Sequence, residues 1–310
     1  MNISSKKILI VGLGLIGGSY AKRLKKNGHY VGAITLNHKD IDYAIENNII
    51  DEGTVEVKKE FVSQFDIVIF ALYPSVFIKW IEQYYSYFKK NAIISDVSGV
   101  KTEVVYKVQE ILKDQSVEFI GAHPMAGREV YGVINSSDTL FEGANFIITP
   151  TPANTQKAID IVSELANELG FKTISILTPS KHDEMIAFLS QLTHCIAVSL
   201  MTCKESQHLK DYTGDSFRDL TRIANINENM WSELFLMNKK ELLSQMDLFI
   251  EEFNKLRDSL ENEDVETMKD MMRLSTYRRS FFNKKWGALL WIWILLENYQ
   301  LLKKSRRCIL

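Results

Sequence analysis

Cysteine is scarce in this 310-residue chain, and its three cysteines are widely spaced. Cys195, Cys203 and Cys308 form no CxxC pair, so they make neither a disulfide framework nor a zinc site. The net charge is only −2, which does not indicate the large basic surface that nucleic acid binding requires. Because 46% of the residues are apolar, disorder is also disfavoured. We expect a folded cytoplasmic protein with no nucleic acid partner.

Long apolar runs are lacking as well. The longest one, residues 288–296, has nine residues, whereas a helix needs about 20 to cross a bilayer. At the N-terminus, Lys6 and Lys7 lead directly into a short apolar strand that ends in glycines, which is unlike a signal peptide. We expect no association with a membrane.

Glycine and proline almost disappear after Lys181. Thirteen of 15 glycines and all five prolines precede it, whereas eight of ten methionines follow it. A chain of this length also usually exceeds a single core. We therefore predict an α/β domain over residues 1–178 and an all-α domain over residues 179–310, with an atypical tail from about residue 287.

The second half has apolar residues at helical spacing. Two such series are Met185, Phe188, Leu189, Leu192 and Ile196, then Leu242, Met246, Phe249, Phe253 and Leu256. Its first helix is expected to begin at Thr178-Pro179, with Ser180 as a capping residue and Asp183 as an acid of the first turn. The apolar surface exceeds what one isolated domain buries. Together with the resemblance to a known family given below, this predicts a homodimer formed through these helices.

A glycine motif follows the first expected strand. Residues 7–11 are apolar apart from Lys7, and Gly12-Leu-Gly-Leu-Ile-Gly-Gly-Ser19 leads into a helix and then a second strand over 30–35. In this context GxGxxG indicates a dinucleotide site: one glycine makes the turn, the next admits the pyrophosphate, and the third lets helix pack on strand. The fold class predicted is a Rossmann-like, doubly wound, mostly parallel sheet. The expected cofactor-binding residues are Gly12, Gly14, Leu15, Ile16, Gly17, Thr35, Leu72 and Pro74.

Further strands and helices are expected to alternate after this unit. Strands are predicted over residues 66–72, 92–95, 118–121, 146–149 and 171–176, and helices over 102–113 and 155–169. Such crossovers are what parallel strands require.

The type of dinucleotide is left open by the end of the second strand. A ribose-binding acid is expected there, but Thr35 occupies the place and the first acid is Asp40. Lacking that acid, the site would not repel a 2′-phosphate, which His38 or Lys39 would attract. Alternatively, Thr35 or Asn37 bonds the ribose hydroxyls. We favour NAD and leave NADP open.

His123 lies in a second glycine-containing segment, Gly121-Ala-His-Pro-Met-Ala-Gly127. A lone histidine is more often structural. This one precedes a proline and follows an expected strand, at the sheet edge where α/β folds bind ligands. Neutral imidazole accepts protons near pH 7, so we interpret His123 as the acceptor for a hydroxyl proton while hydride leaves the same carbon.

Four motifs occur in one order along the chain. They are Gly12-Leu-Gly-Leu-Ile-Gly-Gly-Ser19, Asp96-Val-Ser-Gly-Val-Lys101, His123-Pro-Met-Ala-Gly127 and Phe217-Arg-Asp-Leu-Thr-Arg-Ile-Ala224. Over about residues 6–285 the chain resembles the prephenate dehydrogenase family of tyrosine biosynthesis. The resemblance implies oxidative decarboxylation of prephenate to 4-hydroxyphenylpyruvate, with hydride transfer to NAD(P)⁺ and without a metal.

The resemblance also implies roles for single residues. His123 matches the catalytic histidine, and Arg222 matches an arginine that binds a substrate carboxylate, for which guanidinium is well suited. The other substrate-binding candidates are His194, Ser190, Glu129 and Arg218. From the residues alone, Arg222 equally suits an ion pair with Asp219, and His194 a place on a helix face.

Three departures from the family pattern limit the transfer. Gly99 stands where many members have serine, so Ser98 is the catalytic candidate in its place. In Ser190-Gln-Leu-Thr-His194, one histidine and one proline of the pattern are missing. Residues 289–310 match nothing in the pattern. Their apolar residues are consecutive, which favours a packed last helix over a membrane-surface segment.

Three alternative functions stay open. Arogenate dehydrogenase performs the same chemistry on the amino acid. A β-hydroxyacid dehydrogenase shares the domain plan but would place a catalytic lysine in a glycine-rich helix, which residues 181–310 do not contain. A non-catalytic NAD(P)-sensing protein would be expected to have lost His123 and Arg222.

Overall fold

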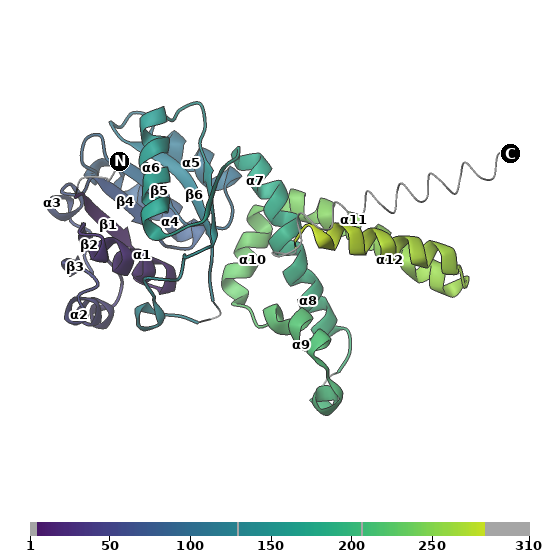
Figure 1. Cartoon of the computed structure of the whole chain (residues 1–310). Coiled ribbons are helices and arrows are strands. Elements are labelled where there is room, and N and C mark those ends of the chain that lie inside the picture. The colour runs from purple at the N-terminus through teal and green to yellow at the C-terminus, as the bar shows by residue number, and fades with distance from the viewer. Residues whose placement is uncertain (1–4, 129, 206, 283–310) are drawn as a thin grey trace. The chain divides into compact units, whose positions relative to one another are not determined.

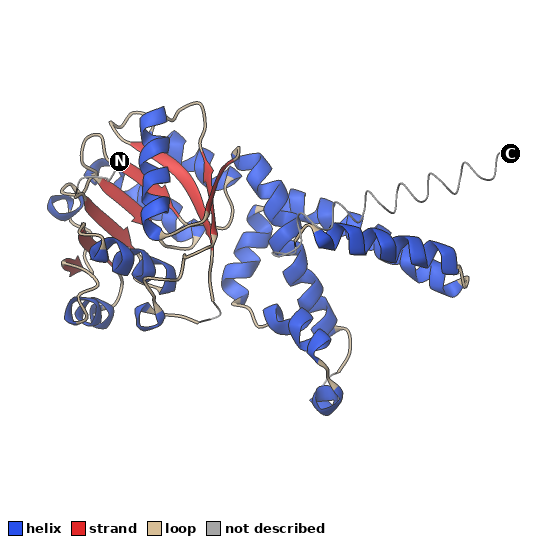
Figure 2. Ribbon diagram, viewed as in Figure 1, coloured by secondary structure: helices blue, strands red, loops and turns tan. Residues whose placement is uncertain are grey.

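The computed structural model describes residues 5–128, 130–205 and 207–282. Contacts divide the chain into two compact units, Met1–Gln245 and Met246–Leu310. The first unit holds the sheet and its helices together with a set of further helices, and the second holds the end of one long helix and the next helix (Figures 1 and 2). The predicted boundary at residues 178 and 179 stays a prediction.

An eight-stranded sheet forms the core of the first unit, in the order β3-β2-β1-β4-β5-β6-β7-β8. The strands are β1 (Lys7–Val11), β2 (Tyr30–Ile34), β3 (Glu52–Thr54), β4 (Ile67–Phe70), β5 (Ile93–Asp96), β6 (Glu118–Met125), β7 (Asn145–Thr149) and β8 (Thr173–Ile176). All neighbours are parallel except β6 and β7. The predicted doubly wound, mostly parallel sheet is confirmed.

Two details of the strand prediction were wrong. The short strand β3 was not predicted, because three residues carry too little pattern. Strand β6 does not end at Gly121 but continues to Met125, so His123 lies inside a strand and pairs with Ile147 of β7. The antiparallel partner explains the extension, since it supplies a ladder for residues that leave the parallel sheet.

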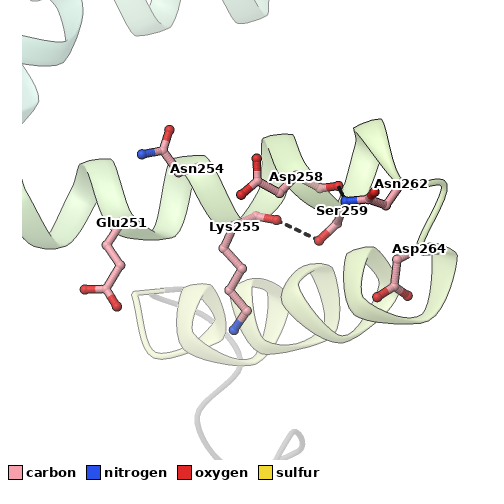
Figure 3. A pocket seen from close by; sticks show the side chains of 7 residues that line it. All are labelled: Glu251, Asn254, Lys255, Asp258, Ser259, Asn262 and Asp264. Atoms are coloured by element: carbon pink, nitrogen blue, oxygen red, sulfur yellow. Dashed lines mark hydrogen bonds between the residues drawn. The ribbon is translucent and has the colours of Figure 1, made fainter.

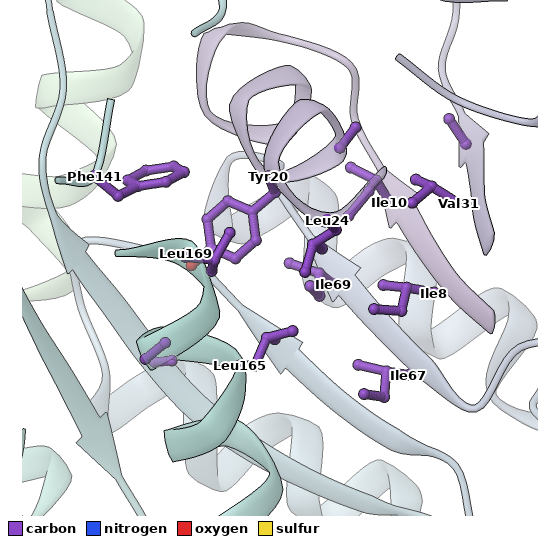
Figure 4. Close-up of a cluster of buried hydrophobic side chains, with 14 of the residues drawn as sticks. Ile8, Ile10, Tyr20, Leu24, Val31, Ile67, Ile69, Phe141, Leu165 and Leu169 are labelled. Atoms are coloured by element: carbon purple, nitrogen blue, oxygen red, sulfur yellow. The ribbon is translucent and has the colours of Figure 1, made fainter. Parts of the chain in front are cut away.

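Helices cover both faces of the sheet. The helices of this part are α1 (Leu15–Lys26), α2 (His38–Glu46), α3 (Lys59–Val62), α4 (Pro74–Tyr84), α5 (Thr102–Leu112) and α6 (Gln156–Leu169). Alternate residues of a strand point to opposite faces. Thus Ile8 and Ile10 pack with Tyr20, Leu24 and Leu165 of α1 and α6 (Figure 4).

The other face uses the intervening strand residues. Leu9 and Val11 pack with Phe77 of α4 and with Val104 and Val108 of α5. Because both faces are buried, the strands are almost continuously apolar, as parallel sheets require.

A second set of helices completes the first unit. These are α7 (Pro179–Ile186), a π-helical turn (Ala187–Gln191), α8 (Leu192–Thr202), α9 (Asp215–Thr221) and α10 (Glu228–Met237), after which α11 (Lys239–Glu261) runs into the second unit. The cap of α7 was assigned wrongly. Thr178, not Ser180, accepts the amide of Lys181, and the first turn of α7 holds no acid, because Asp183 lies beyond it and is buried.

One helical stretch among the described residues, Pro179–Thr202, is long and apolar enough to cross a membrane, with 24 residues and a mean hydropathy of 1.5. It nevertheless carries the buried polar side chains of His182, Asp183 and Gln191. All three are hydrogen-bonded within the first unit. Polar groups bonded in this way are typical of a helix packed inside a globular protein.

The second unit consists of the end of α11 and of α12 (Val265–Ser280). Asp264 caps α12 by accepting the amide of Thr267. Large apolar side chains are exposed on both helices, among them Leu248, Phe249, Ile250, Phe253, Leu260, Met272 and Leu274. The predicted tail from residue 287 lies outside the described residues.

Candidate active site

A pocket of about 600 Å³ opens where the carboxyl ends of β1, β4, β5 and β6 meet the helices of residues 186–234. We call it the sheet-edge pocket. Its walls come from the glycine loop, the loops after β4 and β5, the end of β6, the π-helical turn with α8, and the segment before and within α10. The lining residues used below are Gly14–Gly17, Leu72, Pro74, Ser98, Gly99, His123, Arg128, Ser190, Gln191, His194, Asn225, Asn227, Trp231 and Leu234.

The glycine loop is shaped as the motif predicts. Gly12 has a φ of +103°, and a Cβ there would lie 2.5 Å from the carbonyl oxygen of Ala71. A Cβ on Gly17 would lie 1.9 Å from the oxygen of Gly12, so both positions require glycine. Gly14 is different, because no atom lies within 4 Å of its virtual Cβ. That open space, at the N-terminus of α1, is where a phosphate group would meet backbone amides.

Asp96 organises the loop after β5. Its carboxylate accepts hydrogen bonds from the Lys101 ammonium at 2.6 Å, the Ser98 amide at 3.0 Å and the Ala122 amide at 3.1 Å. The Asp96 and Lys101 side chains are both fully buried. Burial lowers the pKa of Lys101, against the opposing effect of Asp96. This pair fixes the loop that carries Ser98 and Gly99 beside His123.

Ser98 carries an unsatisfied group at the pocket. Its hydroxyl oxygen is buried and has no hydrogen-bond partner among the described residues, although buried polar groups are normally bonded. Gly99 adjoins the same place, since a Cβ there would lie 3.9 Å from Cε1 of His123. An unsatisfied hydroxyl at this position fits a bound ligand.

The ring of His123 is hydrogen-bonded to a second histidine. Its Nδ1 lies 2.9 Å from Nε2 of His182, and Nδ1 of His182 lies 2.8 Å from the carboxylate of Asp183. Burial, followed by the charges of His182 and Lys101, lowers the pKa of His123 well below its usual value. The imidazole is therefore neutral at neutral pH and suited to accept a proton.

The helical wall contributes residues from a π-helical turn. Such turns are rare in proteins overall, but those that occur are often found at functional sites. Ser190 lines the pocket, and its carbonyl accepts a hydrogen bond from Nδ1 of His194 at 2.8 Å. The His194 ring lies against Trp231 of α10, with 3.7 Å between ring centroids. Gln191 bonds the Leu234 carbonyl and Asn238, so it ties the π-helical turn to the end of α10.

The structure brings together most of the predicted site residues. Gly14, Leu15, Ile16, Gly17, Leu72, Pro74, Ser98, His123, Ser190 and His194 all line the sheet-edge pocket. Gly12 shapes the turn beneath it. Thr35 directly follows β2 and is not among the lining residues. The side chain of Asn37 accepts the amide of Lys39 as the cap of α2.

The predicted arginines are not among the residues that line this pocket. Arg222 begins the short 3₁₀ turn Arg222–Ala224 and is exposed, whereas its neighbour Ile223 lines the pocket. Arg218 is exposed, bonds the Thr213 carbonyl and pairs with Asp215 at 3.6 Å. Among the described lining residues, the arginine is Arg128. Glu129 lies outside the described residues.

Several residues of the site were missed by sequence reasoning. In the sequence, His182 and Asp183 resemble the first residues of a helix, and Lys101 is simply the last residue of the motif that begins at Asp96. Their roles depend on long-range contacts, such as the 2.8 Å bond from the Lys101 amide to Asp183. Trp231 and Gln191 carried no local signal either.

A second hollow of about 530 Å³ lies in the unit of residues 246–282 and is lined by seven polar residues (Figure 3). Ser259 donates to the Lys255 carbonyl at 2.7 Å, Asn262 to that of Asp258 at 2.8 Å, and Asp264 caps α12. These side chains serve the two helices themselves. Among all described residues, no group of three or more His, Cys, Asp or Glu is placed to hold a metal ion.

Two family models match the chain in succession. Residues 20–175 match the nucleotide-binding domain of prephenate dehydrogenase, and residues 178–274 match its dimerization domain. The prephenate dehydrogenase of Bacillus subtilis is 30% identical over 275 residues, which are 86% of this chain and 74% of the relative. The cyclohexadienyl dehydrogenase of Zymomonas mobilis is 28% identical over 285 residues, covering 88% and 95%.

A solved structure agrees with these relatives. Prephenate dehydrogenase from Aquifex aeolicus, crystallised with hydroxyphenyl propionate and NAD⁺, has a TM-score of 0.83 and 29% identity, with 91% of this chain and 100% of that chain covered. The order of motifs, the fold and these matches agree along most of the chain. The chain belongs to the prephenate dehydrogenase family.

Proposed function

We propose that this protein is an NAD-dependent prephenate dehydrogenase that converts prephenate to 4-hydroxyphenylpyruvate. One observation carries the proposal. The dinucleotide loop at Gly14, a neutral histidine at position 123, and the helix that carries Ser190 and His194 line a single pocket. Hydride transfer with removal of a hydroxyl proton needs a cofactor, a proton acceptor and a substrate site in such proximity.

The cofactor site fits a dinucleotide. The open space over Gly14 lets a pyrophosphate approach the first-turn amides of α1, and that turn carries no acidic side chain. Leu72 and Pro74 lie at the adjoining strand end, where a nicotinamide ring would extend toward Ser98 and His123. When bound, NAD⁺ accepts a hydride at its nicotinamide ring. NADP is the alternative, since Thr35 follows β2 in place of an acid.

The chain's own part in the chemistry is removal of a proton and placement of the ring. As C4 of prephenate loses its hydride to the cofactor, His123 takes the proton of the C4 hydroxyl. The ring carboxylate leaves as CO₂, its bonding electrons complete the aromatic ring, and the phenolate oxygen so formed takes the proton back from His123. The substrate is thus oxidised by two electrons, which the cofactor receives. Ser98, whose hydroxyl is unsatisfied among the described residues, donates to or accepts from the same hydroxyl or the nicotinamide amide.

The substrate carboxylates are bound on the helical side. His194 and Ser190 lie in the pocket wall, and Arg222 lies next to the lining residue Ile223. A guanidinium presents two parallel donors to a carboxylate. Arg222, Glu129 and Arg218 complete the substrate-binding set, with Arg222 the residue that binds a carboxylate.

Turnover of candidate substrates tests the proposal. Purified protein is mixed with prephenate or arogenate and with NAD⁺ or NADP⁺, and the absorbance of reduced nicotinamide is followed. We expect the highest kcat/KM with prephenate and NAD⁺. Absence of turnover in all four combinations would overturn the enzymatic function.

Arogenate dehydrogenase is the second candidate. A relative named cyclohexadienyl dehydrogenase covers 88% of this chain. Asn225 and Asn227 line the pocket with neutral side chains, which suit a keto group or an ammonium equally. Preference for arogenate over prephenate in the same assay would favour this candidate.

We also infer that the protein is a cytoplasmic homodimer. The match to a dimerization domain over residues 178–274 supports the dimer. Exposed apolar side chains on α11 and α12, such as Phe249, Phe253 and Met272, supply surface for it. Light scattering at micromolar concentration should give twice the chain mass of 35.7 kDa; a monomer would reject the dimer.

A further inference from the structure

Three side chains form a hydrogen-bonded row behind the pocket. Nδ1 of His123 lies 2.9 Å from Nε2 of His182, and Nδ1 of His182 lies 2.8 Å from Oδ1 of Asp183. His123 comes from β6, whereas the other two come from α7. We call this row the His123 relay. Its far end is fully buried, since His182 is 0% and Asp183 is 2% exposed.

Asp183 is fixed as a hydrogen-bond acceptor. Its Oδ1 accepts the amide of Lys101 at 2.8 Å, and its Oδ2 accepts the amide of Thr102 at 2.7 Å. Burial alone would raise the pKa of Asp183, but hydrogen bonds from His182 and Thr102 hold it below the usual value. An ionised carboxylate only accepts hydrogen bonds. The Nδ1 atom of His182 must therefore carry a hydrogen.

The protonation state of His182 then determines the tautomer of His123. Burial, with the charge of Lys101, lowers the pKa of His182, despite the opposing effect of Asp183. A neutral imidazole carries one hydrogen, so Nε2 of His182 is bare and accepts. Its donor is Nδ1 of His123, which leaves Nε2 of His123 as a bare nitrogen. Among the described residues, that atom has no hydrogen-bond partner, and the ring lines the sheet-edge pocket.

We propose that His182 and Asp183 are positioning residues that fix His123 in the Nδ1-protonated tautomer, so that its Nε2 is ready to accept a proton in the pocket. This inference rests on the proposed function for its kinetic consequence, but the tautomer itself does not. When Nε2 takes the substrate proton, the positive charge of His123 is stabilised through His182 by the buried Asp183 carboxylate. After CO₂ has left, Nε2 returns the proton to the phenolate oxygen, which gives the phenol of the product and restores the same tautomer.

Among the described residues, the charged groups that act on the two histidines of the relay are Lys101, Asp96 and Asp183. Lys101, from the loop before α5, opposes a positive charge on both histidines, and Asp96, at the end of β5, neutralises Lys101 at 2.6 Å. Asp183 is the anion bonded to the row itself. Among the described residues, this balance keeps His123 neutral without a carboxylate hydrogen-bonded to it.

Nitrogen NMR tests the tautomer without any substrate. The protein is labelled with ¹⁵N-histidine, and His123 is assigned among the six histidines by the signal that His123→Asn removes. At pH 7 we expect a protonated Nδ1 and a bare Nε2. A protonated Nε2, or a doubly protonated ring, would overturn the inference whatever the enzyme's activity.

A matched pair of variants tests the positioning role by kinetics. In His182→Gln, the amide oxygen stands near the place of Nε2 and still accepts from His123; in His182→Met, of similar size, no strong acceptor remains. Both leave Asp183 on its two backbone amides. We expect kcat to stay within about 10-fold of wild type for glutamine and to fall about 100-fold for methionine, with KM for the substrate little changed.

Asp183→Asn gives an independent reading. When its NH₂ takes the place of Oδ1 and donates to His182, its amide oxygen still accepts the Thr102 amide while the Lys101 amide loses its acceptor, so the relay inverts and Nε2 of His123 becomes protonated. NMR should report that inversion, together with loss of kcat by about 10²–10⁴-fold. If Asp183→Asn does not fold, the comparison of His182→Gln with His182→Met still tests the relay. Equal kcat for the pair would contradict the relay, whereas no turnover by wild type with the expected tautomer would contradict only the proposed function.

Discussion

The two walls of the sheet-edge pocket are built in opposite ways. On the sheet side, Asp96, Lys101, His182 and Asp183 are almost entirely buried and bond one another or backbone amides. On the helical side, Arg218 within α9 and Arg222 at the start of a 3₁₀ turn are exposed and lie outside the pocket lining. The first wall sets the protonation state of His123, whereas the second carries the charges that we propose bind a substrate.

This difference indicates how the two tasks are divided. A proton acceptor must have a defined tautomer and pKa before substrate arrives, which requires a rigid, dry environment. A carboxylate clamp retains its charge in water, because guanidinium stays protonated at all relevant pH values. The sheet wall therefore needs buried partners, and the helical wall does not.

The largest expected effect comes from the sheet wall itself. Replacing His123 with asparagine removes the proton acceptor but keeps a polar side chain of smaller size. We expect kcat with prephenate and NAD⁺ to fall by about 10²–10⁴-fold, with KM changed much less. Initial rates over a range of prephenate concentrations measure both. A mild loss would return His123 to a structural role.

Breaking the buried ion pair should affect stability rather than binding. Asp96→Asn leaves the Lys101 ammonium buried without its counter-charge, which costs about 3–5 kcal/mol of unfolding free energy. The exposed pair on the helical wall supplies the control, since Arg218→Gln should change stability by less than about 0.5 kcal/mol. Urea unfolding followed by circular dichroism measures both variants. Similar losses of unfolding free energy in the two variants would contradict the difference between the two walls.

Arg222 should affect the other kinetic constant. Arg222→Gln removes a charged bond to a substrate carboxylate, a contact shared by ground and transition states, so KM should rise roughly 10- to 100-fold with kcat nearly unchanged. Arg222→Gln should therefore change mainly KM, whereas His123→Asn should change mainly kcat. A fall in kcat alone would place Arg222 with the catalytic groups instead.

The smallest effect is expected at Ser98. Ser98→Ala removes one neutral hydrogen bond to ligand, so kcat/KM should fall about 3- to 10-fold. Because the hydroxyl is unsatisfied among the described residues, stability should not decrease. Thermal unfolding without ligand checks this; a clear loss of stability would show that the hydroxyl serves the fold.

Local sequence signals were enough to predict the sheet wall's outline. The glycine turn, the strands and the position of His123 each depend on short-range sequence patterns. Steric limits add to the pattern, since a Cβ on Gly17 would lie 1.9 Å from the carbonyl oxygen of Gly12. The buried relay was not predictable, because His182 and Asp183 are 59 and more residues from their partners. A His-Asp pair at a helix start has the same local pattern whether it is exposed or buried. Only the fold distinguishes the two.

The central claim is that the buried wall keeps His123 neutral and able to accept a proton, and the pH dependence of kcat tests it most directly. Protonation below the pKa occupies Nε2, so activity is lost as pH falls. Burial and the charges of His182 and Lys101 lower that pKa. We predict that kcat with prephenate and NAD⁺ is flat from about pH 6.5 upward and falls only below the usual histidine value of about 6.5. A kcat that still rises between pH 7 and 8 would contradict the account.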